Sequence, residues 1–361
     1  MLRKGRATAL TWQEVTDFMA TATTPVKGFL LDEEAFRAEH SYKLTPTNLK
    51  GAYAVPAYPD SFDPRTASQA DLTRHGLMWR KPRKEDPPEM RAAWDRAFSR
   101  KWLEKDRIVP ELHPQLGVTH HYRGAKPKQQ TNTSYLTRSW AGAGTKTGKW
   151  TSVIGYWKVP VVTEPPEAQG TEGGWNSSSW LGLDGFFGSN DVLQAGVQQR
   201  VILLPPFNIP ISIYVAWFEW YAPPQVNSPG YIYQTNIANF PVKATDQVYC
   251  GVGYNGTTSG SITFANETNG AHFSITLAPP PGASFDGQSC EWIMEAPDGG
   301  EPTSSIPSFS PVTFTTSFAC GPGNVSTNPA TGDILNIETA SGKVVTSTTV
   351  STDTAVIKFI G

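Results

Sequence analysis

Hydrophobic and polar residues follow a strand-like pattern over the C-terminal two-thirds of the chain. From Trp140 onward, β-branched and aromatic residues form short or alternating runs, and Gly, Pro, Asn and Asp interrupt them. Such runs, bounded by turn residues, are typical of antiparallel strands. The pattern predicts strands over residues 150–163, 178–184, 191–204, 212–221, 231–239, 245–254, 259–265, 271–277, 289–295, 310–318, 333–340, 343–349 and 354–360. So many short strands predict a two-sheet antiparallel β-sandwich.

The N-terminal part has a different pattern. Short helical stretches are joined by Pro-rich connectors, and the spacing predicts helices over 11–20, 68–75 and 89–105. The last of these carries apolar residues at every fourth position, which form one stripe that needs a partner surface: Met90, Trp94, Phe98 and Trp102. Residues 124–138 are polar and are interpreted as a linker. The domains are therefore predicted as a helix-containing region, 1–135, and a β domain, 136–361.

Charge separates the same two parts. Of the 30 Lys+Arg and 32 Asp+Glu in the 361 residues, positions 1–138 hold 23 and 16, a net charge of 23 − 16 = +7. Positions 139–361 hold 7 and 16, a net charge of 7 − 16 = −9. Opposite charges favour docking of the N-terminal region on the β domain. Two roles stay open: a prosegment that covers a groove near neutral pH and is released in acid, or an integral structural layer.

Several classes of function are excluded by what the chain lacks. The three cysteines, Cys250, Cys290 and Cys320, form neither a disulfide framework nor a zinc motif. His272 is the one histidine after position 138, so histidine-based catalysis and His-rich metal sites are disfavoured, and no metal or other cofactor is expected. Basic residues are interleaved with acidic ones, which disfavours nucleic acid as a partner. Prolines interrupt the most apolar stretch, 201–220, so no membrane span is expected, and no signal peptide is visible at the N-terminus.

Four of the predicted strands carry one apolar face and one unusual polar face. Residues two apart share a face of a strand. The polar faces hold amides, carboxylates and tryptophans where Lys, Thr and Ser are usual on a solvent face: Trp180 and Asp184; Gln194 and Gln198; Trp217 and Glu219; Glu291 and Glu295. If the strands share a sheet, these residues form one groove with aromatic walls.

The same strands contain a series of motifs. They read Trp-Leu-Gly-Leu-Asp-Gly at 180–185, Val-Leu-Gln-Ala-Gly at 192–196, Ala-Trp-Phe-Glu-Trp-Tyr at 216–221 and Glu-Trp-Ile-Met-Glu at 291–295. In order and spacing the series resembles the glutamic peptidase (eqolisin) family, and Ser-Trp-Ala-Gly at 139–142 resembles the start of its mature domain. Val215 is a departure, because the fungal pattern commonly has Asp there.

The resemblance implies a fold and a chemistry. The fold would be a concanavalin-A-like jelly roll, and the enzyme an acid-active endopeptidase that takes polypeptide substrates without a cofactor, as a monomer. The catalytic pair would be Gln194 and Glu295. The positions that match the groove of the family are Trp180, Asp184, Trp217 and Glu219, and Glu291 is assigned to substrate binding with them. The fungal relatives are secreted, which suggests secretion, although no signal peptide supports it.

Two other readings remain. Laminarinase-like glycosidases share this kind of sandwich and read E-x-D-x-E on the catalytic strand, a spacing that Glu291 and Glu295 match. Ile293 stands where the helper Asp is expected, and Gln194 would have no role. The second reading is a module that binds carbohydrate or peptide without catalysis, since fold alone does not settle function.

Overall fold

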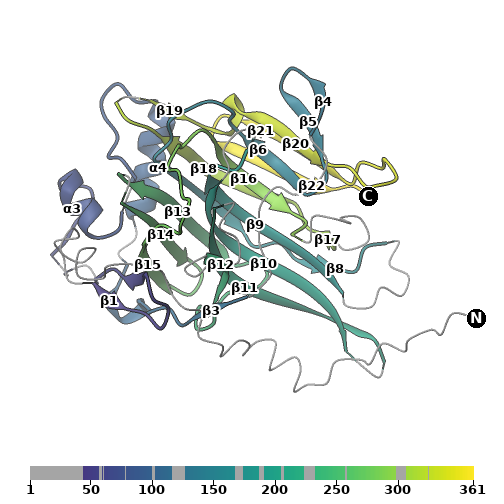
Figure 1. Cartoon of the computed structure of the whole chain (residues 1–361), viewed down its shortest axis with the longest axis horizontal. Helices are drawn as coiled ribbons and strands as arrows, with labels where there is room; N and C mark the ends of the chain where they lie inside the picture. The colour runs from purple at the N-terminus through teal and green to yellow at the C-terminus, as the bar shows by residue number, and fades with distance from the viewer. Residues whose placement is uncertain are drawn as a thin grey trace, which may run out of the picture.

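The chain forms a sandwich of two large sheets (Figure 1). The computed structural model describes residues 44–56, 59, 61–77, 79–99, 102–115, 127–166, 174–186, 191–204, 207–222, 232–256, 258–297, 306–323 and 325–361. The predicted helix over 11–20 lies outside the described residues. Within them, every strand pairing is antiparallel except that of β20 with β5. The predicted two-sheet β-sandwich is confirmed.

The first sheet, sheet A, contains the strands against which the N-terminal helices pack. Its order is β1 (Thr45–Pro46), β2 (Ala52–Ala54), β15 (His272–Leu277), β14 (Ser259–Asn266), β13 (Gln247–Asn255), β7 (Ser152–Lys158), β18 (Val312–Cys320), β22 (Thr354–Phe359) and β21 (Thr346–Ser351), with β19 (Ser326–Thr327) attached to β18.

The second sheet, sheet B, contains all four motif-bearing strands. Its order is β3 (Leu112–Pro114), β12 (Ile232–Ile237), β11 (Ile209–Tyr221), β10 (Val192–Leu204), β9 (Trp175–Leu183), β16 (Cys290–Glu295), β6 (Trp140–Gly144), β20 (Asp333–Ile337), β5 (Ser134–Thr137) and β4 (Lys128–Thr131). A small separate pair joins β8 (Val162–Thr163) to β17 (Ser308–Phe309). The four motif-bearing strands therefore lie in one sheet, which is the condition for their polar residues to share a face.

The core lies between the inward faces of the two sheets. Alternate residues of β9, β10, β11 and β16, such as Leu181, Leu193 and Phe218, are buried there against alternate residues of β13, β14 and β7. Two tryptophans fix the distance between the layers: Trp157 Nε1 donates to Ser179 Oγ (3.0 Å), and Trp292 Nε1 donates to the Ile154 carbonyl oxygen (2.9 Å). Because this inward face is apolar, the alternation sends every polar motif residue of the strands to the outer face of sheet B.

The described part of the N-terminal region is a structural layer on the outer face of sheet A (Figure 1). Helix α4 (Pro88–Ser99) buries Met90, Trp94 and Phe98, and they pack with Trp79 against outward residues of sheet A that include Tyr156 and Tyr249. Helix α3 (Gln69–Arg74) begins after its N-cap Ser68, whose side chain accepts from Asp71 N–H. The predicted apolar stripe therefore has its partner surface, at the back of the molecule relative to the motif residues.

The same region also adds strands to both sheets. Strand β2 pairs with β15 at one edge of sheet A, and β3 pairs with β12 at one edge of sheet B. Strands β4 and β5 continue sheet B at its other end. The interpretation of 124–138 as a linker is therefore wrong over 128–131 and 134–137. The polar composition that suggested a linker suits an edge strand, and all four residues of β4 are exposed.

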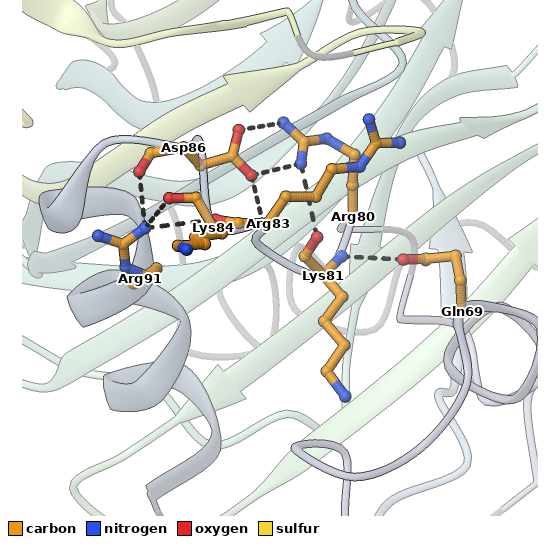
Figure 2. A network of polar contacts seen from close by, with 7 residues as sticks. All are labelled: Gln69, Arg80, Lys81, Arg83, Lys84, Asp86 and Arg91. Carbon is orange, nitrogen blue, oxygen red and sulfur yellow. Dashed lines mark hydrogen bonds and ion pairs between the residues drawn. The ribbon is translucent and has the colours of Figure 1, made fainter.

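A largely buried ion pair fixes the connector between the two helices (Figure 2). Arg80 donates to both carboxyl oxygens of Asp86, at 2.6 and 2.8 Å, and Arg83 N–H donates to one of them at 2.5 Å. Arg91, from α4, donates to the carbonyl oxygens of Arg83, Lys84 and Asp86. The loop is thus held to the helix by charge-assisted hydrogen bonds.

Two short 3-10 helices, η1 (Glu104–Asp106) and η2 (Pro329–Thr331), complete the described secondary structure. The predicted helix 89–105 ends earlier, at Ser99, and Trp102 packs beyond it against Tyr249 and His272. Cys250, Cys290 and Cys320 are buried free thiols. Across the described ranges, no helix has the length and apolarity needed to span a bilayer.

Candidate active site

Backbone register arranges the polar residues of sheet B in rows across its outer face. In the first row, Gln194 of β10 is paired with Glu219 of β11 and with Gly182 of β9, and Gly182 is paired in turn with Glu291 of β16. Gly144 of β6 completes the row beyond Glu291. The row therefore carries a carboxyl, an amide and a second carboxyl, with no side chain between the last two.

The second row, two residues further along, is aromatic. Trp217, Gly196, Trp180 and Ile293 are paired in succession from β11 to β16. Together with Trp140, Phe186, Tyr135 and Leu335, the three large residues of this row form a buried cluster separate from the core between the sheets. Position 196 requires a glycine for steric reasons, because a Cβ there would lie 2.2 Å from the Ser179 carbonyl oxygen and 2.5 Å from Trp180 Cβ.

The third row contains the other predicted catalytic residue. Val215, Gln198, Ser178, Glu295 and Trp140 are paired in succession. Gln194 and Glu295 thus lie on the same face, on the two strands that flank β9, and their rows are four residues apart. They are not partners in one row, and β9 lies between their strands.

Glu295 is held by two tryptophans. Trp140 Nε1 donates to Glu295 Oε1 at 3.0 Å, and Trp180 Nε1 donates to Glu295 Oε2 at 2.8 Å. The two rings pack edge to face, with centroids 4.9 Å apart. The carboxyl group is 99% buried, so these donors fix its orientation in a site of low polarity.

Gln194 is oriented by its row neighbour. Its side-chain amide nitrogen donates to Glu219 Oε2 at 3.2 Å, and both side chains are fully buried. Trp217 Nε1 donates to Ser178 Oγ at 2.8 Å, which sets the ring against the middle of the face. The amide nitrogen of Gln194 carries two N–H groups, so it can donate to a second acceptor as well as to Glu219.

Asp184 departs from the predicted arrangement. Its φ of +68° breaks the alternation at the end of β9, so it does not continue the face that Trp180 and Gly182 share. Its carboxyl accepts hydrogen bonds from Tyr254 OH (2.8 Å), Gly287 N–H (2.8 Å) and Gln288 N–H (2.7 Å). Tyr254 belongs to sheet A and stacks on Trp220 in the core. Asp184 therefore anchors the loop that leads into β16, instead of lining the groove.

Burial controls the charge of two carboxyls near this end of the sheet. Burial, with a smaller contribution from the charge of Asp191, raises the pKa of Asp184 to about 6, against the three hydrogen-bond donors. Burial also raises the pKa of Glu291 well above its usual range, with a smaller contribution in the same direction from Asp184. The Ser289 hydroxyl opposes that shift, although neither oxygen of Glu291 has a partner with hydrogen-bond geometry.

Sequence reasoning missed Trp140 and Ser178 as site residues. Trp140 was noted as part of a motif, but its bond to Glu295 joins residues 155 positions apart and depends on the pairing of β6 with β16. His272 is placed away from this face, on β15, with Nδ1 3.1 Å from the Gly270 carbonyl oxygen. In the part of the chain that the structure describes, no cluster of three or more His, Cys, Asp or Glu is arranged to hold a metal ion.

The outer face of sheet B thus carries a carboxyl group held by two indole donors and an amide group held by a second carboxyl, which are groups that hydrolases use. Residues 138–359 match the model of the peptidase A4 family, and the chain belongs to this family, the eqolisins. It is thus a glutamic endopeptidase. Both the predicted family and the predicted enzyme class are confirmed. The match begins at residue 138, so the layer formed by residues 44–115 lies outside it.

The relatives are distant in sequence. Aspergillopepsin-2 of Aspergillus niger is 27% identical over 243 residues, which cover 64% of this chain and 80% of that protein. The crystal structure of scytalido-glutamic peptidase with a peptide-based transition-state analogue is 22% identical, with a TM-score of 0.48, and covers 62% of this chain and 98% of that one. The structure of aspergilloglutamic peptidase from A. niger is 26% identical, with a TM-score of 0.41, and covers 52% and 99%.

Proposed function

We propose that the protein is an acid-active endopeptidase in which Glu295 is the general base and acid and Gln194 stabilises the oxyanion. The observation that carries the proposal is the pair of indole donors on Glu295, one on each carboxyl oxygen, on the same face as an amide that Glu219 orients. A fixed carboxylate can activate water, and a fixed amide N–H can stabilise a developing negative charge.

The reaction proceeds in two stages. Glu295 takes a proton from a water molecule, whose oxygen bonds to the scissile carbonyl carbon, and the carbonyl oxygen becomes an oxyanion that accepts a hydrogen bond from the Gln194 amide. Protonated Glu295 then gives its proton to the leaving nitrogen as the C–N bond breaks, and the carboxyl product and the amine product separate. This second transfer regenerates Glu295 as a carboxylate. Acid favours the reaction because the amine leaves in its protonated form.

Polypeptides are the proposed substrates, because three tryptophans (Trp140, Trp180 and Trp217) and a carboxyl–amide pair can bind both the apolar and the hydrogen-bonding parts of an extended chain. The described N-terminal layer lies on the other sheet, so it supports the structural role of this region over the role of a cover for the active face. Release or cleavage of the N-terminal region in acid, with a new N-terminus between about 124 and 139, stays a prediction.

The test is digestion of a denatured protein from about pH 2 to pH 8 by the wild type, Glu295→Gln and Gln194→Ala. We expect Glu295→Gln to abolish turnover. We expect Gln194→Ala to lower kcat by about 10²–10³-fold, since one oxyanion donor is worth about 3–4 kcal/mol. The matched controls are Glu104→Gln and Gln130→Ala, which change exposed residues far from the site. Substantial activity in purified Glu295→Gln would refute the assignment.

A further inference from the structure

The strand that bears Glu295 carries a second buried carboxyl with an unusual setting. Glu291 is fully buried, and within the described part of the chain neither of its carboxyl oxygens has a partner that meets hydrogen-bond geometry, although an interaction with the Ser289 side chain lowers its pKa against the effect of burial. A buried polar group without a partner is uncommon in native proteins, because its lost contact with water is not replaced. By contrast, Glu295, four residues away on the same face, has a donor on each oxygen.

Glu291 shares a row with the predicted oxyanion donor. Only Gly182 lies between Glu291 and Gln194 across the sheet, and a glycine places no side chain between them. A side chain at position 182 would be tightly placed, since a Cβ there would lie 3.0 Å from Gln194 Cβ and 3.2 Å from the Trp180 ring. On its other side Glu291 faces a second glycine, Gly144, where a Cβ would lie 3.3 Å from Glu291 Cγ.

The neighbours of Glu291 do not supply a countercharge. Phe186 and Ile293 are apolar, Asp184 is a carboxyl group that disfavours a second negative charge, and the Ser289 hydroxyl accepts a hydrogen bond from Phe186 N–H. Burial, which raises the pKa of Glu291, keeps this group in its protonated form in acid. A protonated carboxyl offers one hydrogen-bond donor and one acceptor. A peptide amide offers the complementary acceptor and donor.

We propose that Glu291 is a substrate-binding residue of the active face, which exchanges hydrogen bonds with a backbone amide of the bound polypeptide beside Gln194. The inference rests on the proposed function for the identity of the ligand. It assigns Glu291 no part in breaking the bond, so it predicts an effect on KM and on the dissociation constant of peptide, with kcat nearly unchanged. Glu291→Gln keeps one donor and one acceptor at the same size, and Glu291→Leu removes both.

The first experiment compares kcat and KM for a denatured protein substrate at about pH 4. We expect Glu291→Leu to raise KM by about tenfold or more, as expected for losing hydrogen bonds worth about 1.4 kcal/mol, and kcat to change by less than about threefold. Glu291→Gln, which keeps one donor and one acceptor, is expected to raise KM less than Glu291→Leu does. If Glu291→Leu fails to fold, Glu291→Met replaces it as the apolar variant.

A binding measurement separates this inference from the proposed function. The anisotropy of rhodamine-labelled, oxidised insulin B chain gives its dissociation constant for Glu295→Gln and for Glu295→Gln combined with Glu291→Leu. Tenfold weaker binding in the double variant supports the inference, even if the wild type proves unable to cleave. Equal binding and equal KM, together with a higher melting temperature of Glu291→Leu, would show a merely structural group and overturn it. Loss of kcat in Glu291→Gln with intact binding would also overturn it, because Glu291 would then be a reacting carboxyl.

Discussion

The outer faces of the two sheets are both buried aromatic surfaces, but they treat their carboxyl groups in opposite ways. On sheet A, Asp86 receives two hydrogen bonds from Arg80 and one from Arg83 N–H. On sheet B, Glu291 receives none that meets hydrogen-bond geometry, and Glu295 receives two from uncharged indoles. The first arrangement stabilises a fold. The second uses no charged partner.

Acid should act in opposite directions on two buried carboxyls, Asp86 in the N-terminal layer and Asp184 in the loop that leads into β16. The pKa of Asp86 is lowered, chiefly by its hydrogen bonds from Arg80, so its stabilising contribution is present above the pKa of the unfolded chain and is lost as pH falls through the folded pKa. The pKa of Asp184 is raised to about 6, so its contribution is complete below about pH 4 and is lost as pH rises through about 6. Acid would therefore weaken the back layer while the loop that Asp184 anchors keeps its full stability.

The largest effect is expected from breaking the ion pair of the layer. Arg80→Met leaves Asp86, whose side chain is 3% exposed, without its charged partner, and should lower the free energy of unfolding by about 3–5 kcal/mol. Urea unfolding at neutral pH measures this. The kcat of the folded fraction should match that of the wild type, because the layer lies on the other sheet. A specific loss of kcat in folded Arg80→Met would contradict the division into a structural face and an active face.

An intermediate effect is expected from the indole donors of the active face. Trp180→Phe and Trp140→Phe keep an aromatic ring but remove one hydrogen bond each from Glu295. Each should lower kcat by about 10-fold, corresponding to about 1.4 kcal/mol, through a less well-positioned carboxylate. Steady-state kinetics measure it, and Trp157→Phe, which changes a core indole bonded to Ser179, is the matched control. Unchanged kcat in both site variants would show that the two indole donors do not position Glu295 for catalysis.

The smallest effect concerns the pH dependence of stability. Asp184→Asn removes the group that ionises near pH 6 and keeps an acceptor for only one of the Gly287 and Gln288 N–H groups, which bond to different carboxyl oxygens. The wild type should lose stability between about pH 4 and pH 7, and the variant should lose less over that interval. Melting temperatures across this range test it. A slope that is the same in both proteins would show that Asp184 is not the responsible group.

The sequence predicted the strands of the sandwich closely because alternation directly reflects burial of one face. The strand predicted over 191–204 is β10, Val192–Leu204, and the one predicted over 289–295 is β16, Cys290–Glu295. The strands of the N-terminal region were not predicted, because β2 and β3 have only three residues each and depend on pairing with strands far along the chain. Local pattern contains no information about such partners.

The candidate site was predicted less completely, for two physical reasons. Alternation places a residue on a face only while the backbone stays extended. Asp184 has a positive φ at the end of β9, so alternation does not predict the direction of its side chain. Contacts between distant strands are also invisible to spacing, which is why Trp140 was not recognised as a partner of Glu295. Period-two alternation alone predicted which residues share the outer face, given that their strands lie in one sheet: Gln194, Trp217, Glu219, Glu291 and Trp180.

The central claim is that the scissile carbonyl binds on the outer face of sheet B between Gln194 and Glu295. The most direct measurement is a crystal structure of Glu295→Gln with an uncleaved peptide. The account predicts the scissile carbonyl oxygen about 3 Å from Gln194 Nε2, with residue 295 within reach of a water that is placed to attack. A peptide bound elsewhere, or one whose scissile carbonyl lies away from Gln194, would contradict it.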